Sequence, residues 1–461
     1  MNCDVIPVVR TLSADTLTPL VAFAALSDSG SEAFLFESVE RGENLGRYSF
    51  VGFEPRRNLT FDGTVSDPVR VLNEELVPLC VEGEDQLPPF FGGAVGYFGY
   101  GVAGWSERIP DSHPNDLGIP DAKLLFFDNV VVFDHVRQRM HVVANVFRGG
   151  TIEDANARLD RAIAKLKRAS VEPLAFGDAK GVEFRATHTR ESFMQMVRDA
   201  KEEIAAGELF QIVLSQRWEA DFPTSEALTL YRALRSINPS PYMFLLRTNE
   251  CTLVGASPEM LVRVTGRTVE TRPIAGTRPR GATHEQDREH EASLLADPKE
   301  RAEHLMLVDL GRNDVGRVCE SGSVVVEDFC RVERYSHVMH LVTDVHGTLR
   351  SDCTPVDAFL SCFPAGTVSG APKIRAMELI DRFETSRRGP YAGTVAYFSF
   401  NGNLDSCITI RTVTLANDKA YVQAGAGIVF DSDPATEYAE TENKSLALRR
   451  AISVAAAALK S

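Results

Sequence analysis

In the first third of the chain, apolar residues fall in short runs that are broken by glycine and proline. These runs occupy residues 33–37, 47–52, 124–133 and 142–147. They are rich in β-branched and aromatic side chains, which predicts strands. We therefore expect a segment rich in β-sheet up to about residue 150.

Two later stretches, 153–169 and 191–206, have apolar residues at a helical spacing and predict amphipathic helices. Between them, residues 171–182 form a loose stretch that we interpret as a linker. We therefore expect two domains, residues 1–170 and residues 183–461.

Beyond the predicted linker, strand and helix patterns are mixed. Short apolar runs predict strands at 210–214, 243–247, 252–255, 260–264, 393–400, 406–415 and 420–424. The pairs Thr354-Pro355 and Asp297-Pro298 mark helix starts. Since the two patterns do not alternate strictly, the sequence indicates an α+β class rather than a doubly wound fold.

Two stretches share an unusual acidic helix start, in which Asp-Pro is followed by two glutamates three residues apart. They are Asp297-Pro298 with Glu300 and Glu303, and Asp433-Pro434 with Glu437 and Glu440. Side chains three apart project from one helix face. Each pair alone is also explained as helix capping and complementation of the helix dipole. If the two helix starts met across a cleft, their oxygen ligands could hold Mg²⁺.

The first acidic helix also carries apolar residues, namely Leu305, Met306 and Leu310. We expect this stripe to fix the helix to a core.

Composition and charge narrow the classes of protein. The 461 residues are 44% hydrophobic and 25% charged, as in an ordinary globular enzyme. A net charge of -15 argues against nucleic acid or an anionic membrane as the main partner. Eight scattered cysteines without a CxxC pair indicate neither a zinc site nor a disulfide framework. With no signal-like start and no membrane-length apolar run, we expect a cytoplasmic protein.

Glycines mark several predicted strand ends and turns, including Gly276-Thr277, Gly366-Thr367 and the run from Gly425 to Gly427. Glycine at such places lets a ligand approach the backbone, and exposed N–H groups bind carboxylates. Any one of them is equally explained as an ordinary turn.

Taken together, these segments resemble the chorismate-utilising enzymes, and most closely the members that form anthranilate. The similar segments span nearly the whole chain and lie at residues 35–38, 238–243, 273–277, 302–309, 337–340, 364–373 and 423–427. The resemblance implies a large β-sheet sandwich surrounded by helices. It also implies a lyase of tryptophan biosynthesis, which converts chorismate and ammonia to anthranilate and pyruvate.

The resemblance places binding roles on particular residues. Glu303 and Glu440 match the principal Mg²⁺ ligands, with Glu300 and Glu437 completing an acidic ring. Mg²⁺ would in turn hold the ring carboxylate of chorismate. The residues that match substrate-binding positions are Gly276, Thr277, Tyr391, Arg411, Gly425, Ala426, Gly427 and Lys444.

The resemblance also implies catalytic roles. Glu259 matches the general acid that protonates the departing C4 hydroxyl, and burial would have to raise its pKa. Gln211 stands where water-using relatives have a lysine base, and glutamine cannot deprotonate water, which favours ammonia as the nucleophile. His340 is our candidate for removing the C2 proton, although a lone histidine is often structural. Thr367 is expected to orient the substrate.

Ala275 bears on the nearest alternative, which is the formation of aminodeoxychorismate. Enzymes of that type usually carry lysine at this position and stop before pyruvate leaves. Alanine favours complete conversion to anthranilate, while Gln211 argues against isochorismate formation. A catalytically silent tryptophan-binding regulator would show damage to the acidic ring or Glu259, and none is visible.

The resemblance further implies a tryptophan pocket for feedback inhibition in the N-terminal domain. Ser38 would bind the amino acid head group, while Pro241, Tyr242 and Met243 would supply walls for the indole. The chain has no Gly-x-Cys-x-Gly nucleophile elbow. We therefore expect ammonia to come from glutamine through a separate amidotransferase subunit, in a heterotetramer.

Overall fold

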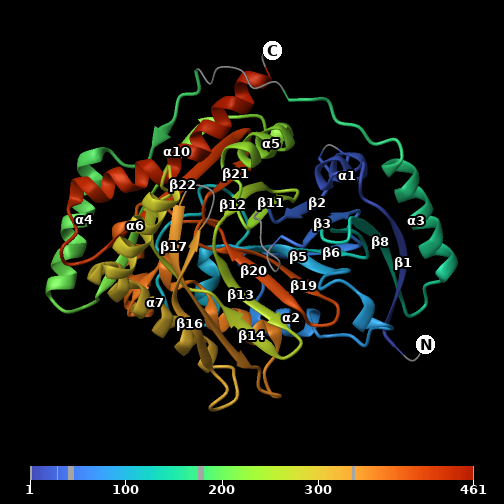
Figure 1. Cartoon of the computed structure of the whole chain (residues 1–461), viewed down its shortest axis with the longest axis horizontal. Helices are drawn as coiled ribbons and strands as arrows, with labels where there is room; N and C mark the ends of the chain where they lie inside the picture. The colour runs from blue at the N-terminus through green and yellow to red at the C-terminus, as the bar shows by residue number, and fades with distance from the viewer. Residues whose placement is uncertain (1–2, 29, 40–45, 175–180, 335–337, 460–461) are drawn as a thin grey trace.

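Two large antiparallel sheets form the centre of the computed structural model, and helices surround them (Figure 1). The structure describes residues 3–28, 30–39, 46–174, 181–334 and 338–459. Within this part of the chain, one sheet has 12 strands and the other has 10. The α+β class is therefore confirmed.

The 12-stranded sheet combines strands from both halves of the chain. Its strands, in spatial order, are β1 (Val5–Ser13), β8 (Arg139–Phe147), β7 (Asn129–Asp134), β3 (Tyr48–Phe53), β2 (Ala33–Glu37), β11 (Tyr242–Arg247), β12 (Thr252–Ser257), β21 (Thr412–Ala416), β22 (Lys419–Ile428), β10 (Gln211–Asp221) and β18 (Gly370–Ala371), with β9 (Arg185–Ala186) paired to β10.

The 10-stranded sheet is also shared between the two halves. Its strands, in spatial order, are β15 (Ile274–Pro279), β17 (Val338–Thr348), β14 (Thr268–Thr271), β13 (Met260–Thr265), β20 (Leu404–Ile408), β19 (Thr394–Ser399), β5 (Gly93–Phe98), β6 (Ala122–Phe127) and β4 (Arg57–Phe61), with β16 (Val325–Arg334) paired to β17.

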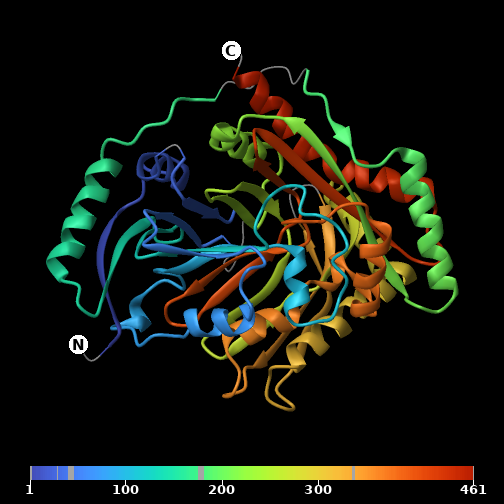
Figure 2. The ribbon, with the colours of Figure 1, turned by 180° about the vertical axis from the view of Figure 1, so that it is seen from behind.

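The helices surround this pair of sheets. They are α1 (Pro19–Leu26), α2 (Pro68–Glu75), α3 (Ile152–Leu166), α4 (Arg190–Ala205), α5 (Ala227–Ile237), α6 (His284–Ala296), α7 (Pro298–Gly316), α8 (Pro355–Cys362), α9 (Lys373–Phe383) and α10 (Pro434–Ala458). Figure 2 shows α3 and α4 on opposite sides of the molecule. Among the described residues, none of the helices combines the length and apolar character needed to span a bilayer.

Strand β7 shows why the sheets stack as they do. Successive side chains of a strand point to opposite faces. Val131 and Phe133 pack in a core with residues of α1, α3, α5 and α10. Val130 and Val132 face a second core that contains residues of the other sheet. The central strands are apolar on both faces because both faces are buried.

Two runs that looked like single strands in the sequence are each divided between the sheets. The run 124–133 contains β6 and β7, separated by the largely buried Asp128. The run 406–415 contains β20 and β21, and Arg411 between them has a positive φ of 51°. Apolar pattern alone missed these crossings because the strands on either side are equally buried.

One prediction about the first acidic helix needs correction. Leu305 is 56% exposed, so it does not fix the helix to a core. The helix is instead buried through His304, Leu307, Val308 and Val315. The charged residues 284–296, which precede this helix, form α6. The sequence pattern did not predict α6, because few of its residues are buried, so its apolar residues show no helical spacing.

The two predicted domains share their sheets. Strand β2 of the first segment pairs with β11 of the second, and β5 pairs with β19. Backbone hydrogen bonds between strands therefore connect residues 1–170 with residues 183–461. The division into a regulatory and a catalytic domain remains a prediction. Part of the proposed linker, residues 175–180, lies outside the described residues.

Candidate active site

A cavity of about 760 Å³ lies where α7, α10, β10, β15, β17 and β22 meet. With one exception, every predicted catalytic, substrate-binding and metal-binding residue lines it. The lining includes Gln211, Glu259, Gly276, Thr277, Glu300, Glu303, His340, Thr367, Tyr391, Arg411, Gly425, Gly427, Glu437, Glu440 and Lys444.

The exception is Ala426. Strand alternation directs Gly425 and Gly427 toward the cavity and Ala426 to the opposite face. Its side chain is fully buried in the core that also contains Leu214, its partner across the ladder. Any contact of Ala426 with a ligand would therefore come from its backbone.

Both acidic helices begin as their sequences predicted. The Asp297 carboxylate accepts hydrogen bonds from the backbone N–H of Lys299 (3.0 Å) and of Glu300 (3.3 Å). The Asp433 carboxylate accepts one from the Thr436 N–H at 2.9 Å. These caps and the proline after each aspartate fix where the helices start, so the glutamates of both first turns face the same cavity.

The four glutamates bring two separate acidic helix faces into one cavity. Burial raises the pKa of Glu303, and the charges of Glu300 and Glu440 raise it further, while a hydrogen bond from Gln211 opposes the rise. Burial also raises the pKa of Glu437, and the charge of Glu440 adds to this. An all-carboxylate set fits a hard cation such as Mg²⁺.

The four carboxylates are not arranged as a metal-binding cluster in this structure. Among the described residues, no three His, Cys, Asp or Glu groups are arranged to hold a metal ion. Glu300 forms an ion pair with Arg278 at 3.2 Å, and Glu440 forms one with Lys444 at 2.6 Å.

The pKa of Glu259 lies in the range that suits a general acid near neutral pH. Burial raises its pKa from 4.5 to about 7, while the Thr367 hydroxyl and the Lys444 charge act in the opposite direction. Thr367 Oγ1 is buried and makes no hydrogen bond of good geometry within the described part of the chain. A carboxyl whose pKa lies close to neutral pH and the Thr367 hydroxyl thus line the same cavity.

His340 is held by the glycine turn of β15. Its Nδ1 lies 2.8 Å from the carbonyl oxygen of Gly276 and 3.1 Å from Thr277 Oγ1. A carbonyl can only accept, so Nδ1 carries the proton, and in the neutral ring Nε2 carries the lone pair. Burial lowers the pKa of His340, which keeps the ring neutral at pH 7.

Gly276 itself is required by the turn. Its φ of +64° favours glycine, and a Cβ there would lie 2.9 Å from Leu294 and 3.1 Å from Glu300.

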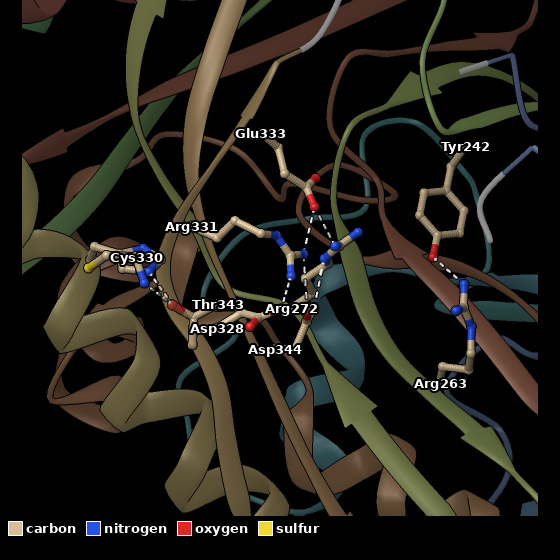
Figure 3. A network of polar contacts seen from close by, with 10 residues as sticks. Tyr242, Arg263, Arg272, Asp328, Cys330, Arg331, Glu333, Thr343 and Asp344 are labelled. Atoms are coloured by element: carbon tan, nitrogen blue, oxygen red, sulfur yellow. Dashed lines mark hydrogen bonds and ion pairs between the residues drawn. The ribbon is translucent and has the colours of Figure 1, made fainter. Parts of the chain in front are cut away.

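An ion-pair network joins β16 to β17 (Figure 3). Arg331 contacts Glu333 at 2.7 Å and Asp344 at 3.1 Å, and Arg272 contacts Asp344 at 2.9 Å. Glu333 is the cross-strand partner of His340. The network therefore ties β16 and β17 to the segment that enters β15.

Three predicted substrate-binding side chains also line the cavity, namely Tyr391, Arg411 and Lys444. Burial raises the pKa of Tyr391 to about 12, which keeps its phenol protonated. Burial lowers the pKa of Arg411, and the guanidinium makes no ion pair or hydrogen bond with described residues. Lys444 Nζ donates to the Gly425 carbonyl at 3.0 Å. A phenol, a guanidinium and an ammonium thus converge on a space suited to an anion.

Sequence reasoning missed a buried ion pair behind this site. Arg388 contacts Glu384 at 2.6 Å and also donates to the carbonyls of Val368 and Val213, at 2.7 and 2.8 Å. Its guanidinium lies 5.7 Å from the centre of the Tyr391 ring. The pair supports the Thr367 turn and Tyr391, and only its i, i+4 spacing was visible in the sequence.

A second cavity, of about 330 Å³, contains all four residues predicted to bind tryptophan, Ser38, Pro241, Tyr242 and Met243. Ser38 Oγ is buried and has no hydrogen-bond partner among the described residues. Tyr242 Oη receives a hydrogen bond from Arg263 at 3.2 Å (Figure 3). Pro241 lines both cavities, so one segment separates them.

Comparisons with known proteins show the family of this chain. A family model described as chorismate binding enzyme matches residues 31–450. The chain is 47% identical over 466 residues to anthranilate synthase component 1 of Thermus thermophilus, covering 98% of this chain and 99% of that protein. It is 46% identical over 473 residues to the protein of that name from Acetivibrio thermocellus, covering 97% and 95%.

Solved structures give the same result. Anthranilate synthase component I from Streptococcus pneumoniae superimposes with a TM-score of 0.80 at 36% identity, covering 95% of this chain and 99% of that one. The menaquinone-specific isochorismate synthase MenF of Escherichia coli shares the fold, with a TM-score of 0.74 at 21% identity over 98% and 96%. The chain belongs to the chorismate-binding enzyme family.

Proposed function

We propose that the chain converts chorismate and ammonia to anthranilate and pyruvate, with Mg²⁺ as its cofactor. Relatives at 46% and 47% identity over nearly the full length support this activity. The observation that carries the chemistry is that one cavity contains Glu259, with a pKa of about 7, and His340, with its proton fixed on Nδ1. These groups supply an acid for one elimination and a base for the other.

The metal site follows from the four carboxylates. Glu303 and Glu440 would be the principal ligands, with Glu300 and Glu437 completing the ring. When bound, Mg²⁺ would neutralise the ring carboxylate of chorismate, which an acidic chain would otherwise repel.

In the same cavity, Arg411 would bind the enolpyruvyl carboxylate. Its planar fork suits a carboxylate, and no described residue already pairs with it. Tyr391 and Lys444 would donate to other oxygens of the substrate.

Amination would begin at C2 of the ring. The Gln211 side-chain N–H group donates to Glu303 at 3.3 Å, which leaves the amide oxygen to accept a hydrogen bond from ammonia. The ammonia nitrogen forms a bond to C2, the ring double bonds shift, and the C4–O bond breaks. Glu259 gives its proton to the departing hydroxyl, which leaves as water. Ammonia needs no base to act as a nucleophile, and Gln211 supplies none.

Aromatisation would follow by the loss of pyruvate. His340 Nε2 takes the C2 proton, the electron pair enters the ring, and the C3–O bond breaks. The released enolpyruvate gains a proton and becomes pyruvate. Ala275, which lines the cavity, adds neither a charge nor a nucleophile beside this step.

The second cavity would bind tryptophan as an inhibitor. Its volume of about 330 Å³ lies within the usual range for a small-molecule site. Ser38 Oγ would bind the amino acid head group, while Pro241, Tyr242 and Met243 would contact the indole. Tyr242 pairs with Ser257, two residues before Glu259. A shift of residues 241–243 on binding would therefore reach the catalytic acid.

The ammonia would come from a partner glutamine amidotransferase subunit. The relatives carry the name component 1, and this chain contains no Gly-x-Cys-x-Gly elbow for glutamine hydrolysis. A heterotetramer of the two subunits is the assembly that we expect.

The test is a nitrogen-source assay on the purified chain with chorismate and Mg²⁺. Ammonium at pH 8 should support anthranilate formation, and glutamine alone should not. If ammonium does not support anthranilate formation, the proposal is wrong. If glutamine alone supports it, the chain does not need a partner subunit.

A further inference from the structure

Two of the four carboxylates that line the cavity are already neutralised by cations of the chain. Arg278 Nη1 lies 3.2 Å from Glu300 Oε1. Lys444 Nζ lies 2.6 Å from Glu440 Oε1. One carboxylate from each acidic helix is therefore paired.

Arg278 links the start of α7 to the turn that carries the predicted substrate-binding groups. Its Nη2 contacts Asp297 Oδ2 at 2.7 Å, and its Nη1 also donates to the Thr277 carbonyl at 2.9 Å. Lys444 has a similar second contact, to the Gly425 carbonyl. Each cation thus joins an acidic helix to a strand that carries part of the substrate site.

These two ion pairs hold Glu300 and Glu440 toward cations of the chain and not toward the other carboxylates of the cavity. An oxygen that is paired with an ammonium or guanidinium group does not offer the same lone pairs to a metal ion. Across the described ranges, no three potential ligands are arranged for a metal, although four carboxylates line one cavity.

We propose that Arg278 and Lys444 are internal counter-cations of the acidic ring, which a divalent cation must displace when it binds. The proposal rests on the metal site of the proposed function. Metal binding is then an exchange, in which Glu300 leaves Arg278 and Glu440 leaves Lys444. The released Lys444 ammonium becomes available to an anionic substrate, so the metal prepares the site for that substrate.

The exchange is energetically accessible because the pairs are only partly buried. The side chains of Arg278 and Glu300 are each 24% exposed, and those of Lys444 and Glu440 are 36% and 42% exposed. Ion pairs of this kind contribute little, so removing one cation should tighten metal binding by roughly two- to fivefold.

Lys299 provides a matched control. It lines the same cavity, and its charge lowers the pKa of both Glu303 and Glu437. It forms no ion pair with any residue that the structure describes. Substitution of Lys299 therefore changes the general field of the ring without releasing a carboxylate.

The experiment measures Mn²⁺ binding to the full chain by electron paramagnetic resonance of free Mn²⁺, in the absence of chorismate. We expect Arg278→Gln and Lys444→Gln each to lower the Mn²⁺ dissociation constant by about two- to fivefold. Lys299→Gln should have a smaller effect, and Arg278→Lys, which keeps the charge, should stay close to the unsubstituted chain. Circular dichroism would verify that each variant is folded.

Glu303→Gln separates the two ways in which the idea can fail. If this variant loses Mn²⁺ binding while Arg278→Gln matches Lys299→Gln, the exchange is wrong and the metal site stands. If Glu303→Gln binds Mn²⁺ like the unsubstituted chain, both the metal site and the exchange are wrong.

Discussion

The Nδ1 atom of His340 lies 2.8 Å from the carbonyl oxygen of Gly276, and this contact determines which ring nitrogen can act as a base. Because Nδ1 holds the proton, Nε2 has the lone pair of the neutral ring. Burial lowers the pKa of His340, so the neutral form predominates at pH 7 and above. The base would be lost only as the pH falls through that lowered value.

Substitution of His340 should separate the two halves of the reaction. In His340→Asn, an amide can still donate to Gly276 but cannot remove the C2 proton. We expect anthranilate formation to fall by about 10²- to 10⁴-fold, while the aminated intermediate, which keeps its enolpyruvyl group, accumulates. Mass spectrometry of the products measures both. His188, which does not line the cavity, is the control for loss of a histidine. An equal loss of amination and aromatisation would contradict the assigned role.

Glu259 should determine the alkaline limb of the pH profile. Its pKa of about 7 means that the protonated form decreases as the pH rises above 7. We expect kcat/KM to fall by up to tenfold per pH unit in that range. Glu259→Gln should lower kcat by about 10²- to 10⁴-fold and remove this limb. An alkaline limb that persists unchanged in the variant would assign the titration to another group.

Gly425 should be required for the position of Tyr391. A Cβ at residue 425 would lie 2.9 Å from both the Tyr391 hydroxyl and the Leu214 carbonyl oxygen, and the backbone atom cannot easily move. We expect Gly425→Ala to raise KM for chorismate roughly tenfold, since overpacking of this size displaces the side chain. Gly316→Ala is the control, because a Cβ there meets nothing within 4 Å. Equal KM values for the two variants would show that Tyr391 does not depend on this contact.

Ser38 should affect inhibition without affecting turnover. Its buried hydroxyl has no partner in the described structure and lies in the second cavity. Loss of a hydrogen bond to a charged head group should raise the half-inhibitory tryptophan concentration by roughly 10- to 100-fold in Ser38→Ala. Initial rates at several tryptophan concentrations measure this. Ser31→Ala, which alters a serine outside the cavity, should leave inhibition unchanged. If Ser38→Ala does the same, the inhibitor binds elsewhere.

The sequence predicted the chemistry of the site better than its surroundings. Fifteen cavity-lining residues were predicted. The local pattern singled out the glutamates after the two Asp-Pro helix starts and the glycine turns, whereas the resemblance to a known family implied the roles of the others, such as Tyr391 and Arg411. Ala426 was not separated from its glycine neighbours, since the direction of a side chain depends on the register of β22 with β10. The Arg388–Glu384 pair was missed because its importance depends on burial between elements far apart in the sequence.

The sequence predicted the α+β class and the positions of most strands, but it did not predict how the strands pair. Alternating and apolar runs located most strands, but β6 and β7 read as one because both are buried on every face. The sequence also suggested a separate N-terminal domain, whereas β2 and β5 pair with strands of the second half. Such pairings are long-range and leave no mark in the local pattern.

Product analysis with ¹⁵N-labelled ammonium tests the central claim most directly. The purified chain, chorismate, Mg²⁺ and the labelled ammonium are allowed to react to completion, and the products are measured by mass. The proposed function predicts anthranilate that carries the label, together with an equal amount of pyruvate. A labelled product that keeps its enolpyruvyl group, or an unlabelled isochorismate, would contradict it.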